Sequence, residues 1–374
     1  MKDQDQLAGA NSQQYQAGGS IEVHNHGMTA AEVADLAMTI FRQNFIRFGE
    51  EAMQIAVSRA EELVDSYLRR MQSEAPAHIS SAADPSMQRA IYTAQAEYAS
   101  RGDSDLGSLL VEVLVERSQE KANTMRAIAL AEAIGASSKL TSIHYKLLAV
   151  VVMLRYTTFF QWRDQAAFRK GLQKHLLALF PINDTYLHRR RYPSPLPLTQ
   201  MDLQHMEYVG VGRTGGTDFD VLERYPKIYP GIFSHDFTLD ELDPILHSEI
   251  DRPPFIRTEG DPEKLRLAAV THSDLDNLKR PQRRIRENIH LLHDLLDQNK
   301  FQRNEVYSFF QMRPLYKDQQ MFNYRAFEYL IEIFQKLGVN QFELSSVGIV
   351  VGRAVWKQYC DNIPPLQWYI PEPD

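Results

Sequence analysis

Apolar residues between positions 28 and 71 recur every three or four residues, which is the spacing of one face of an α-helix. Thr29 and Glu32 match a capping box, in which a hydroxyl and a carboxylate satisfy the first free backbone amides. The pattern predicts one helix, about 60 Å long if unbroken, with a bend at Gly49. The stripe that should pack against other helices includes three phenylalanines, Phe41, Phe45 and Phe48.

Further amphipathic stretches follow in the first half of the chain. They predict helices over 87–99, 106–134, 147–154 and 162–180, with a polar linker over 73–86 and Gly135 ending one helix. Asp103 to Asp105 can cap the helix over 106–134. The run 147–154, "LLAVVVML", is too short to cross a bilayer, so it predicts a buried helix and no membrane span. The first half is therefore expected to form a helical bundle.

The pattern changes after residue 181, where prolines, glycines and aromatic residues become frequent. We expect four parts: an N-terminal β-segment over 1–27, a helical bundle over 28–181, an irregular or mixed region over 182–262, and a C-terminal helical domain over 263–374. In the last part, helices are predicted over 275–299, 304–311 and 323–337. A short strand over 341–344 then precedes a helix capped by Ser345 or Ser346, an order that a winged-helix-like unit would show. The predicted fold class is mainly α, with a short N-terminal β-hairpin and a C-terminal α+β unit.

Composition narrows the class of protein. The chain has 374 residues, 44% of them hydrophobic and 24% charged, which is ordinary for a globular protein. A single cysteine, Cys360, excludes a disulfide framework, and the N-terminus lacks the apolar region of a secretory signal, so a cytoplasmic location is expected. The net charge of −7 argues against a general nucleic-acid binder.

Several short motifs suggest chemistry but lack the spacing that the chemistry requires. The histidines of "HNH" at 24–26 have no further ligands nearby, and "VGVGRTGG" at 209–216 lacks the lysine and the following helix of a phosphate-binding loop. The acids and histidines of 234–251 fit a helix entry better than a metal site. A lone cysteine beside Trp356 and Tyr359 indicates packing. We therefore assign no catalytic residue, metal ligand or cofactor.

Two basic clusters could contact a nucleic-acid backbone, with a nearby tyrosine available for stacking. The alternative is a solvated helix face in which the arginines pair with neighbouring carboxylates. The candidate residues are Arg189, Arg190, Arg191, Arg280, Arg283, Arg284 and Arg286.

The segment "NSQQYQAGGSIEVHNHG", residues 11–27, alternates like a strand on both sides of a Gly-Gly pair that can turn the chain. A two-stranded hairpin alone is marginal in water, but copies from several subunits could pair edge to edge, with glutamine ladders adding hydrogen bonds. The alternative is a disordered tail. The candidate self-association residues are Tyr15, Gln16, Gly18, Gly19, Ile21 and Val23.

This segment resembles the short "QxGxxφxφ" motifs (φ apolar) that precede effector or adaptor modules in bacterial immune signalling, including amyloid-forming ones. The longer chain resembles a family of uncharacterised bacterial proteins through "MTAAEVADLAMTIFRQNF", "EEAMQIAVSRAEEL", "SKLTSIHYKLLAVVVMLRYT", "YPGIFSHDFTLDEL" and "FELSSVGIVVGRAV". The resemblance implies a component of anti-phage defence or genetic conflict. The family has no assigned activity, so no functional residues carry over.

Three classes of function follow from these patterns. The first is a non-catalytic, self-associating interaction protein of anti-phage defence, a homo-oligomer with a protein partner or a phage trigger. The second is a nucleic-acid-binding protein that uses the arginine clusters. The third is an enzyme with an unrecognised site in the middle region.

Overall fold

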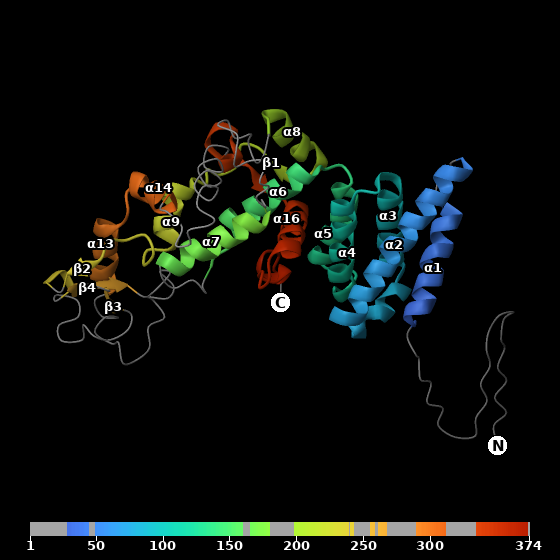
Figure 1. Cartoon of the computed structure of the whole chain (residues 1–374), viewed down its shortest axis with the longest axis horizontal. Coiled ribbons are helices and arrows are strands. Elements are labelled where there is room, and N and C mark those ends of the chain that lie inside the picture. Colours follow the sequence, from blue (N-terminus) through green and yellow to red (C-terminus); the bar gives the residue numbers. More distant parts are fainter. Residues whose placement is uncertain are drawn as a thin grey trace, which may run out of the picture.

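The computed structural model describes residues 28–44, 49–159, 165–179, 198–238, 240–242, 255–258, 261–267, 289–311 and 334–372. The protein is mainly α-helical, which confirms the predicted class. Helices α1 to α5 stand side by side at one end of an elongated molecule, and short strands lie at the other end (Figure 1). The C-terminal segment returns to the middle, so that α16 lies between the bundle and α6.

Seven α-helices and two short helical turns build the bundle and its inner neighbours in the described part of the chain. They are α1 (Ala30–Asn44), α2 (Glu50–Glu74), η1 (Pro76–Ala83), α3 (Pro85–Arg101), α4 (Ser104–Gln119), α5 (Met125–Ser137), α6 (Ser142–Val151), the π-helical turn η2 (Val152–Tyr156) and α16 (Ser346–Tyr359). The turn η1 replaces the predicted linker, and its Ala82 is buried.

The predicted single helix over 28–71 is wrong, because α1 folds back onto α2. The buried ring of Phe41 packs with Ala56 and Ala60. Arg42 also pairs with Glu61 at 3.2 Å, although an unbroken helix would separate these residues by about 28 Å. The spacing of apolar residues in the sequence is the same on both sides of the reversal, because each helix buries one face. Phe45 and Phe48 lie outside the described residues.

Polar caps set several helix starts. The predicted capping box is present: the Thr29 amide donates to Glu32 Oε2 at 2.7 Å, and the Glu32 amide donates to Thr29 Oγ1 at 3.3 Å. Asp103 accepts from the first amides of α4, as predicted. Thr124 caps α5, so the predicted helix over 106–134 is two helices. Gly135 lies inside α5 instead of ending it.

The run 147–154 is buried, as predicted, and packs closely against α16. Two glycines of α16, four residues apart, allow close approach: Gly352 to this run and Gly348 to Val211. A Cβ atom on Gly352 would lie 2.5 Å from the carbonyl oxygen of Leu148, and one on Gly348 would overlap the carbonyl of Val211. The backbones of these segments are therefore nearly in contact.

The rest of the described chain forms a second, more mixed region. It contains α7 (Gln165–Leu179), α8 (Gln200–Val209), α9 (Val221–Ile228), α13 (Ile289–Asn299) and α14 (Arg303–Gln311), with an antiparallel sheet in the order β2 (Phe237–Thr238), β4 (Asp261–Leu267) and β3 (Phe255–Thr258). Aromatic rings fill its interior, with Phe168 in edge contact with Tyr225, Tyr229 and Phe233.

The predicted strand and helix near the C-terminus are both present. The strand β5 (Glu343–Leu344) precedes α16, and the Ser345 hydroxyl accepts from the Gly348 amide at 3.2 Å. Their partners come from earlier parts of the chain, however: β5 pairs with β1 (Gly212–Arg213), and α16 packs on α4, α5 and α6. The predicted domain boundaries stay predictions. No helix in the described part of the chain is long and apolar enough to cross a membrane.

Candidate functional site

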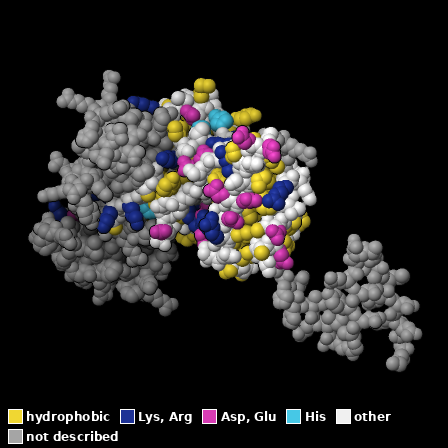
Figure 2. Space-filling model, turned by 45° about the vertical axis from the view of Figure 1, so that its right-hand side comes forward, with side chains coloured by type: hydrophobic (Ala, Val, Ile, Leu, Met, Phe, Trp, Pro, Cys, Tyr) yellow, Lys and Arg dark blue, Asp and Glu magenta, His cyan; other side chains and the backbone are white. Residues whose placement is uncertain are grey.

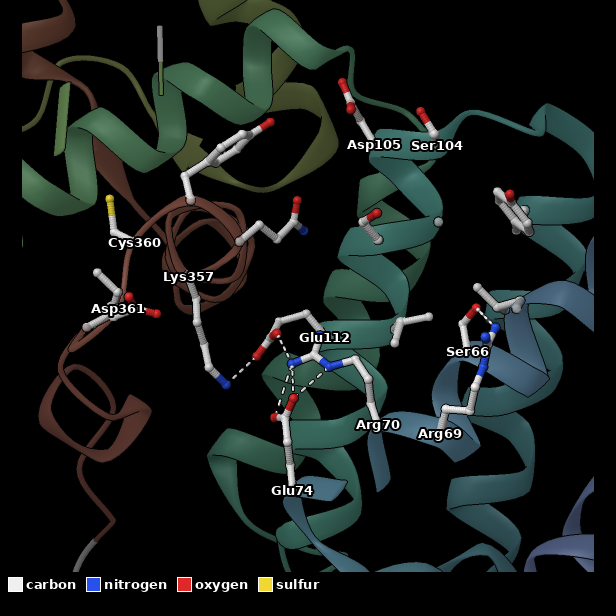
Figure 3. Close-up of a pocket in the computed structure, with 18 of the residues that line it drawn as sticks. Ser66, Arg69, Arg70, Glu74, Ser104, Asp105, Glu112, Lys357, Cys360 and Asp361 are labelled. Atoms are coloured by element: carbon white, nitrogen blue, oxygen red, sulfur yellow. Dashed lines mark hydrogen bonds and ion pairs between the residues drawn. The ribbon is translucent and has the colours of Figure 1, made fainter. Parts of the chain in front are cut away.

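A cleft of about 1190 Å³ opens between α2, α4 and α16. Tyr98 of α3 and the segment 360–363 after α16 complete its walls (Figure 3). On the described face that Figure 2 shows, basic and acidic side chains intermingle with hydrophobic ones, and most residues that line the cleft are polar. Polar residues therefore dominate a surface that three sequence-distant helices create together.

The floor of the cleft is a buried ion-pair network centred on Glu112 of α4. The Glu112 side chain is only 2% exposed, and its two oxygens pair with Arg70 of α2 and Lys357 of α16, each at 2.6 Å (Figure 3). Burial acts to raise the pKa of Glu112, but the charges and hydrogen bonds of Lys357 and Arg70 outweigh it and lower the pKa. Glu112 is thus an ionised carboxylate held between two cations.

The network extends on both sides of Glu112. Arg70 also binds Glu74 at 2.8 Å, and Lys357 lies 3.4 Å from Glu116. Glu116 in turn pairs with Arg353, one helical turn before Lys357. Salt bridges thus join α16 to α2 and α4, and each of these floor cations has a carboxylate partner.

Three further carboxylates line the cleft outside this network: Glu62, Asp105 and Asp361. Glu62 accepts a hydrogen bond from the Tyr98 hydroxyl at 3.3 Å, and Asp105 accepts one from Ser142 at 2.8 Å. Neither carboxylate has a cationic partner among the described residues, and the same holds for Asp361. In Figure 3, Asp105 lies at the opposite end of the cleft from Glu74.

Neutral titratable groups line the wall formed by α16. Burial, and secondarily the charge of Asp105, raises the pKa of Tyr359, whose side chain is 40% exposed. Burial also raises the pKa of the Cys360 thiol, so this cysteine stays protonated and unreactive at neutral pH. That environment agrees with the packing role that the sequence indicates for Cys360.

A hydroxyl, an imidazole and a carboxylate also meet between α6 and α8. His144 lies 3.2 Å from the Thr141 hydroxyl and 3.0 Å from Asp202. The backbone amide of Thr141 donates to the same His144 Nδ1 at 3.2 Å, however, so that nitrogen is already occupied as a helix cap. Asp202 belongs to the capping box of α8, in which its Oδ2 accepts hydrogen bonds from the amide and the hydroxyl of Thr199. The arrangement joins two helix starts and does not leave a free general base.

The candidate residues predicted from the sequence lie outside the described residues. This holds for the self-association segment and for both arginine clusters, which therefore stay predictions. Within the described part of the chain, no group of three or more His, Cys, Asp or Glu side chains is arranged to hold a metal ion.

The two polar segments of the middle region have structural roles where they are described. Gly210 ends α8 in the left-handed conformation, and β1 follows. The sequence predicted no helix after "VGVGRTGG". That prediction is wrong, because α9 follows and begins at the cap residue Asp220. Thr238 and Glu241 form a capping box, as the helix-entry interpretation predicts, and His235 lies 3.1 Å from Glu305.

Sequence reasoning missed the cleft, although two signals point to it. Glu112 interrupts the apolar run "LLVEVLV" of α4, which marks a charge on a face that should be buried. In α16, Arg353 and Lys357 lie four residues apart and so share one face, next to the glycine pair. Neither signal names the partner helix, because Arg70 and Glu112 lie far from α16 in the sequence.

Fold and site together define a mainly α-helical protein with a charged interhelical cleft. A family model matches residues 27–368 of the chain. The chain belongs to this family, for which no activity is assigned. The matched range begins at Gly27, the last residue of the segment 11–27 (the Gln-Gly segment). Searches of curated proteins and of solved structures find no match to the chain.

Proposed function

We propose that this protein is a cytoplasmic, non-catalytic, self-associating interaction protein of bacterial anti-phage defence. It assembles through residues 12–25 and recognises a protein partner or phage trigger with its helical body. The observation that carries the proposal is the strand-like alternation around Gly18 and Gly19, directly before a helix with a defined start.

The energetics of the segment favour association over an isolated hairpin. Ordering one backbone residue costs about 1–2 kcal/mol, whereas full burial of an apolar side chain recovers about 1.5–3 kcal/mol. Tyr15, Ile21 and Val23 are the large apolar residues of the segment, and three such side chains cannot offset the ordering of more than ten residues. Neighbouring copies would supply the missing hydrogen bonds and buried area.

The position of α1 supports this proposal. Its inner face buries Val33, Ala37 and Phe41 against the bundle, and it stands at the edge of the molecule (Figure 1). A segment that joins the chain at Met28 therefore starts at an edge of the body, where copies can meet without disturbing the core.

The test is to replace Ile21 and Val23 with Asp in the full-length chain. The added charges lie on the apolar face of the predicted strand, so the assembly should become smaller or less stable while the helical body stays folded. Light scattering and analytical ultracentrifugation measure the size, and circular dichroism measures the helix content. A chain that starts at Met28 provides the limiting case.

The matched control places Asp at Ser20 and His24, on the opposite face of the same predicted strand. It introduces two acids in the same segment without replacing the apolar residues, so its effect on size should be smaller. If wild type, both double variants and the truncated chain have one and the same assembly state, the segment is a tail and the proposal fails.

Nucleic-acid binding through the arginine clusters is the second candidate. The observation in its favour is the concentration of basic residues in "HRRRY" and "KRPQRRIR". Such binding would weaken steeply as salt rises, because phosphate contacts release counterions. A tight complex that persists at physiological salt and weakens on charge reversal at Arg283 and Arg284 would favour this candidate over the interaction protein.

A further inference from the structure

We propose that the cleft between α2, α4 and α16 binds a flexible organic cation, a basic peptide segment of a partner protein. The site is separate from residues 12–25 and does not depend on self-association. The inference rests on the charges, aromatic rings and volume of the cleft.

The charge of the lining favours a cationic ligand. In the part of the chain that the structure describes, five carboxylates and three basic side chains line the cleft. Arg70 and Lys357 are held by Glu112, Glu74 and Glu116 on the floor. The remaining side chains are the three carboxylates without a cationic partner and one cation, Arg69, which binds only the Asp65 carbonyl and the Ser66 hydroxyl among the described residues. The net charge of these remaining side chains is therefore negative.

The unpaired carboxylates stand beside tyrosine rings on two sides of the cleft. On one side, the Tyr98 hydroxyl binds Glu62. On the other side, Tyr359 lies within the field of Asp105 and keeps 40% of its side chain exposed. A carboxylate supplies the counter-charge for an ammonium or guanidinium group, and the exposed ring of Tyr359 adds a cation–π contact of about 0.5–1 kcal/mol. Tyr98 is only 7% exposed, so it contributes its hydroxyl to Glu62 and no ring face to the ligand.

The alternative of an anionic ligand fits these residues less well. Among the described residues, Arg69 would be the single lining cation available, and the floor cations would first have to leave Glu112. Removing one partner from such a buried pair leaves an uncompensated charge, which costs about 3–5 kcal/mol. A cation meets carboxylates that are already free of basic partners and leaves the network intact.

The size of the cleft favours a polypeptide over a small amine. Its volume of about 1190 Å³ exceeds the range of about 300–1,000 Å³ of ordinary small-molecule pockets. Neutral hydrogen-bonding groups, Ser104, Ser108, Gln358 and Asn362, lie along the same lining and can serve a peptide backbone. Lysine and arginine side chains would then reach the separate carboxylates Glu62, Asp105 and Asp361 along the lining.

The experiment titrates the full-length protein with hexalysine and, in a second arm, with spermine, by isothermal calorimetry at physiological salt. We expect saturable binding of one hexalysine per chain and weaker binding of spermine. The variant Asp105→Asn/Asp361→Asn removes two negative charges at nearly constant shape, and it should weaken hexalysine binding about tenfold. The single variants keep the test valid if the double variant does not fold.

The matched control, Glu51→Gln/Glu132→Gln, removes two exposed carboxylates outside the cleft and changes net charge equally. It should leave affinity within about twofold of wild type. Equal weakening in both variants would mean general charge attraction, and no saturable binding of either probe to wild type would exclude the site. Tighter binding of spermine than of hexalysine would replace the peptide with a free polyamine. The Ile21→Asp/Val23→Asp variant should bind hexalysine normally, which separates this inference from the proposed assembly.

Discussion

The two faces of α16 stabilise the molecule by opposite means. One face presents Gly348 and Gly352 to neighbouring backbone, with no room for a single extra carbon atom. The other presents Arg353 and Lys357 to Glu112 and Glu116 across the cleft. The glycine contact depends on the absence of side-chain volume, and the other contact depends on opposite charges. One helix therefore forms part of the core and also a wall of the candidate site.

The charged face should be the more sensitive to loss of a single group. Replacing Glu112 with Ala removes the buried counter-charge that Arg70 and Lys357 share and leaves them only the more exposed Glu74 and Glu116, which should lower the free energy of unfolding by about 3–5 kcal/mol. Chemical denaturation followed by circular dichroism measures the change.

Glu74→Gln is the control for this prediction, because Glu74 binds the same arginine from a half-exposed position. Exposed pairs contribute about 0–1 kcal/mol, so this variant should remain close to wild type. Equal effects at Glu74 and Glu112 would show that burial of the network contributes nothing to its strength.

The apolar face should respond to added volume. Gly352→Ala brings a methyl group to 2.5 Å from the Leu148 carbonyl oxygen, and overpacking of this kind costs about 1–3 kcal/mol. Gly135→Ala is the matched substitution, because it lies inside α5 and meets no atom within 4 Å. It should stabilise the protein by up to about 1 kcal/mol through helix propensity. If both alanine variants changed stability in the same direction, close backbone approach at α16 would not explain the glycine.

Local patterns predicted the elements better than their packing. The capping box at Thr29 and the caps at Asp103 and Ser345 depend on side chains within three residues, and all three are present. The reversal between α1 and α2 was missed, since an amphipathic period is unchanged when a helix folds back on its continuation. The pairing of β1 with β5 joins residues about 130 positions apart, which no local pattern encodes.

The cleft illustrates the same limit for function. Glu112 is recognisable as an anomaly within an apolar run, but its meaning depends on Arg70 and Lys357, which come from helices far away in the sequence. The arginine clusters and the Gln-Gly segment were visible as compositional signals, and they lie outside the described residues. Composition thus located candidate chemistry, while only tertiary structure placed charges within bonding distance.

A titratable group packed against the apolar side of α16 extends the comparison to pH. His175 of α7 is buried, and its Nδ1 accepts a hydrogen bond from the Trp356 indole at 2.9 Å. Burial, and secondarily the charge of Lys174, lowers the pKa of His175 to about 4. A proton on Nδ1 would also point at the indole N–H, so the folded protein resists protonation of this ring.

The direction of the pH effect follows from linkage. An unfolded histidine titrates near about 6.5, so between that pH and about 4 the unfolded chain binds more protons than the folded one. The contribution of His175 is therefore fully present above about pH 6.5 and is lost as the pH falls toward 4. Between pH 7.5 and 4.5 the free energy of unfolding should drop by about 2–3 kcal/mol from this group.

His175→Asn isolates that contribution, because the Asn carbonyl oxygen can still accept from Trp356 but does not titrate. The variant should be less stable than wild type at pH 7.5, since a smaller side chain leaves space beside the indole. Its stability should depend less on pH from 7.5 to 4.5, so the two proteins should converge as the solution becomes acidic. Parallel curves over that range would show that His175 accepts a proton in the folded state, and that the apolar side of α16 tolerates charge as the cleft side does.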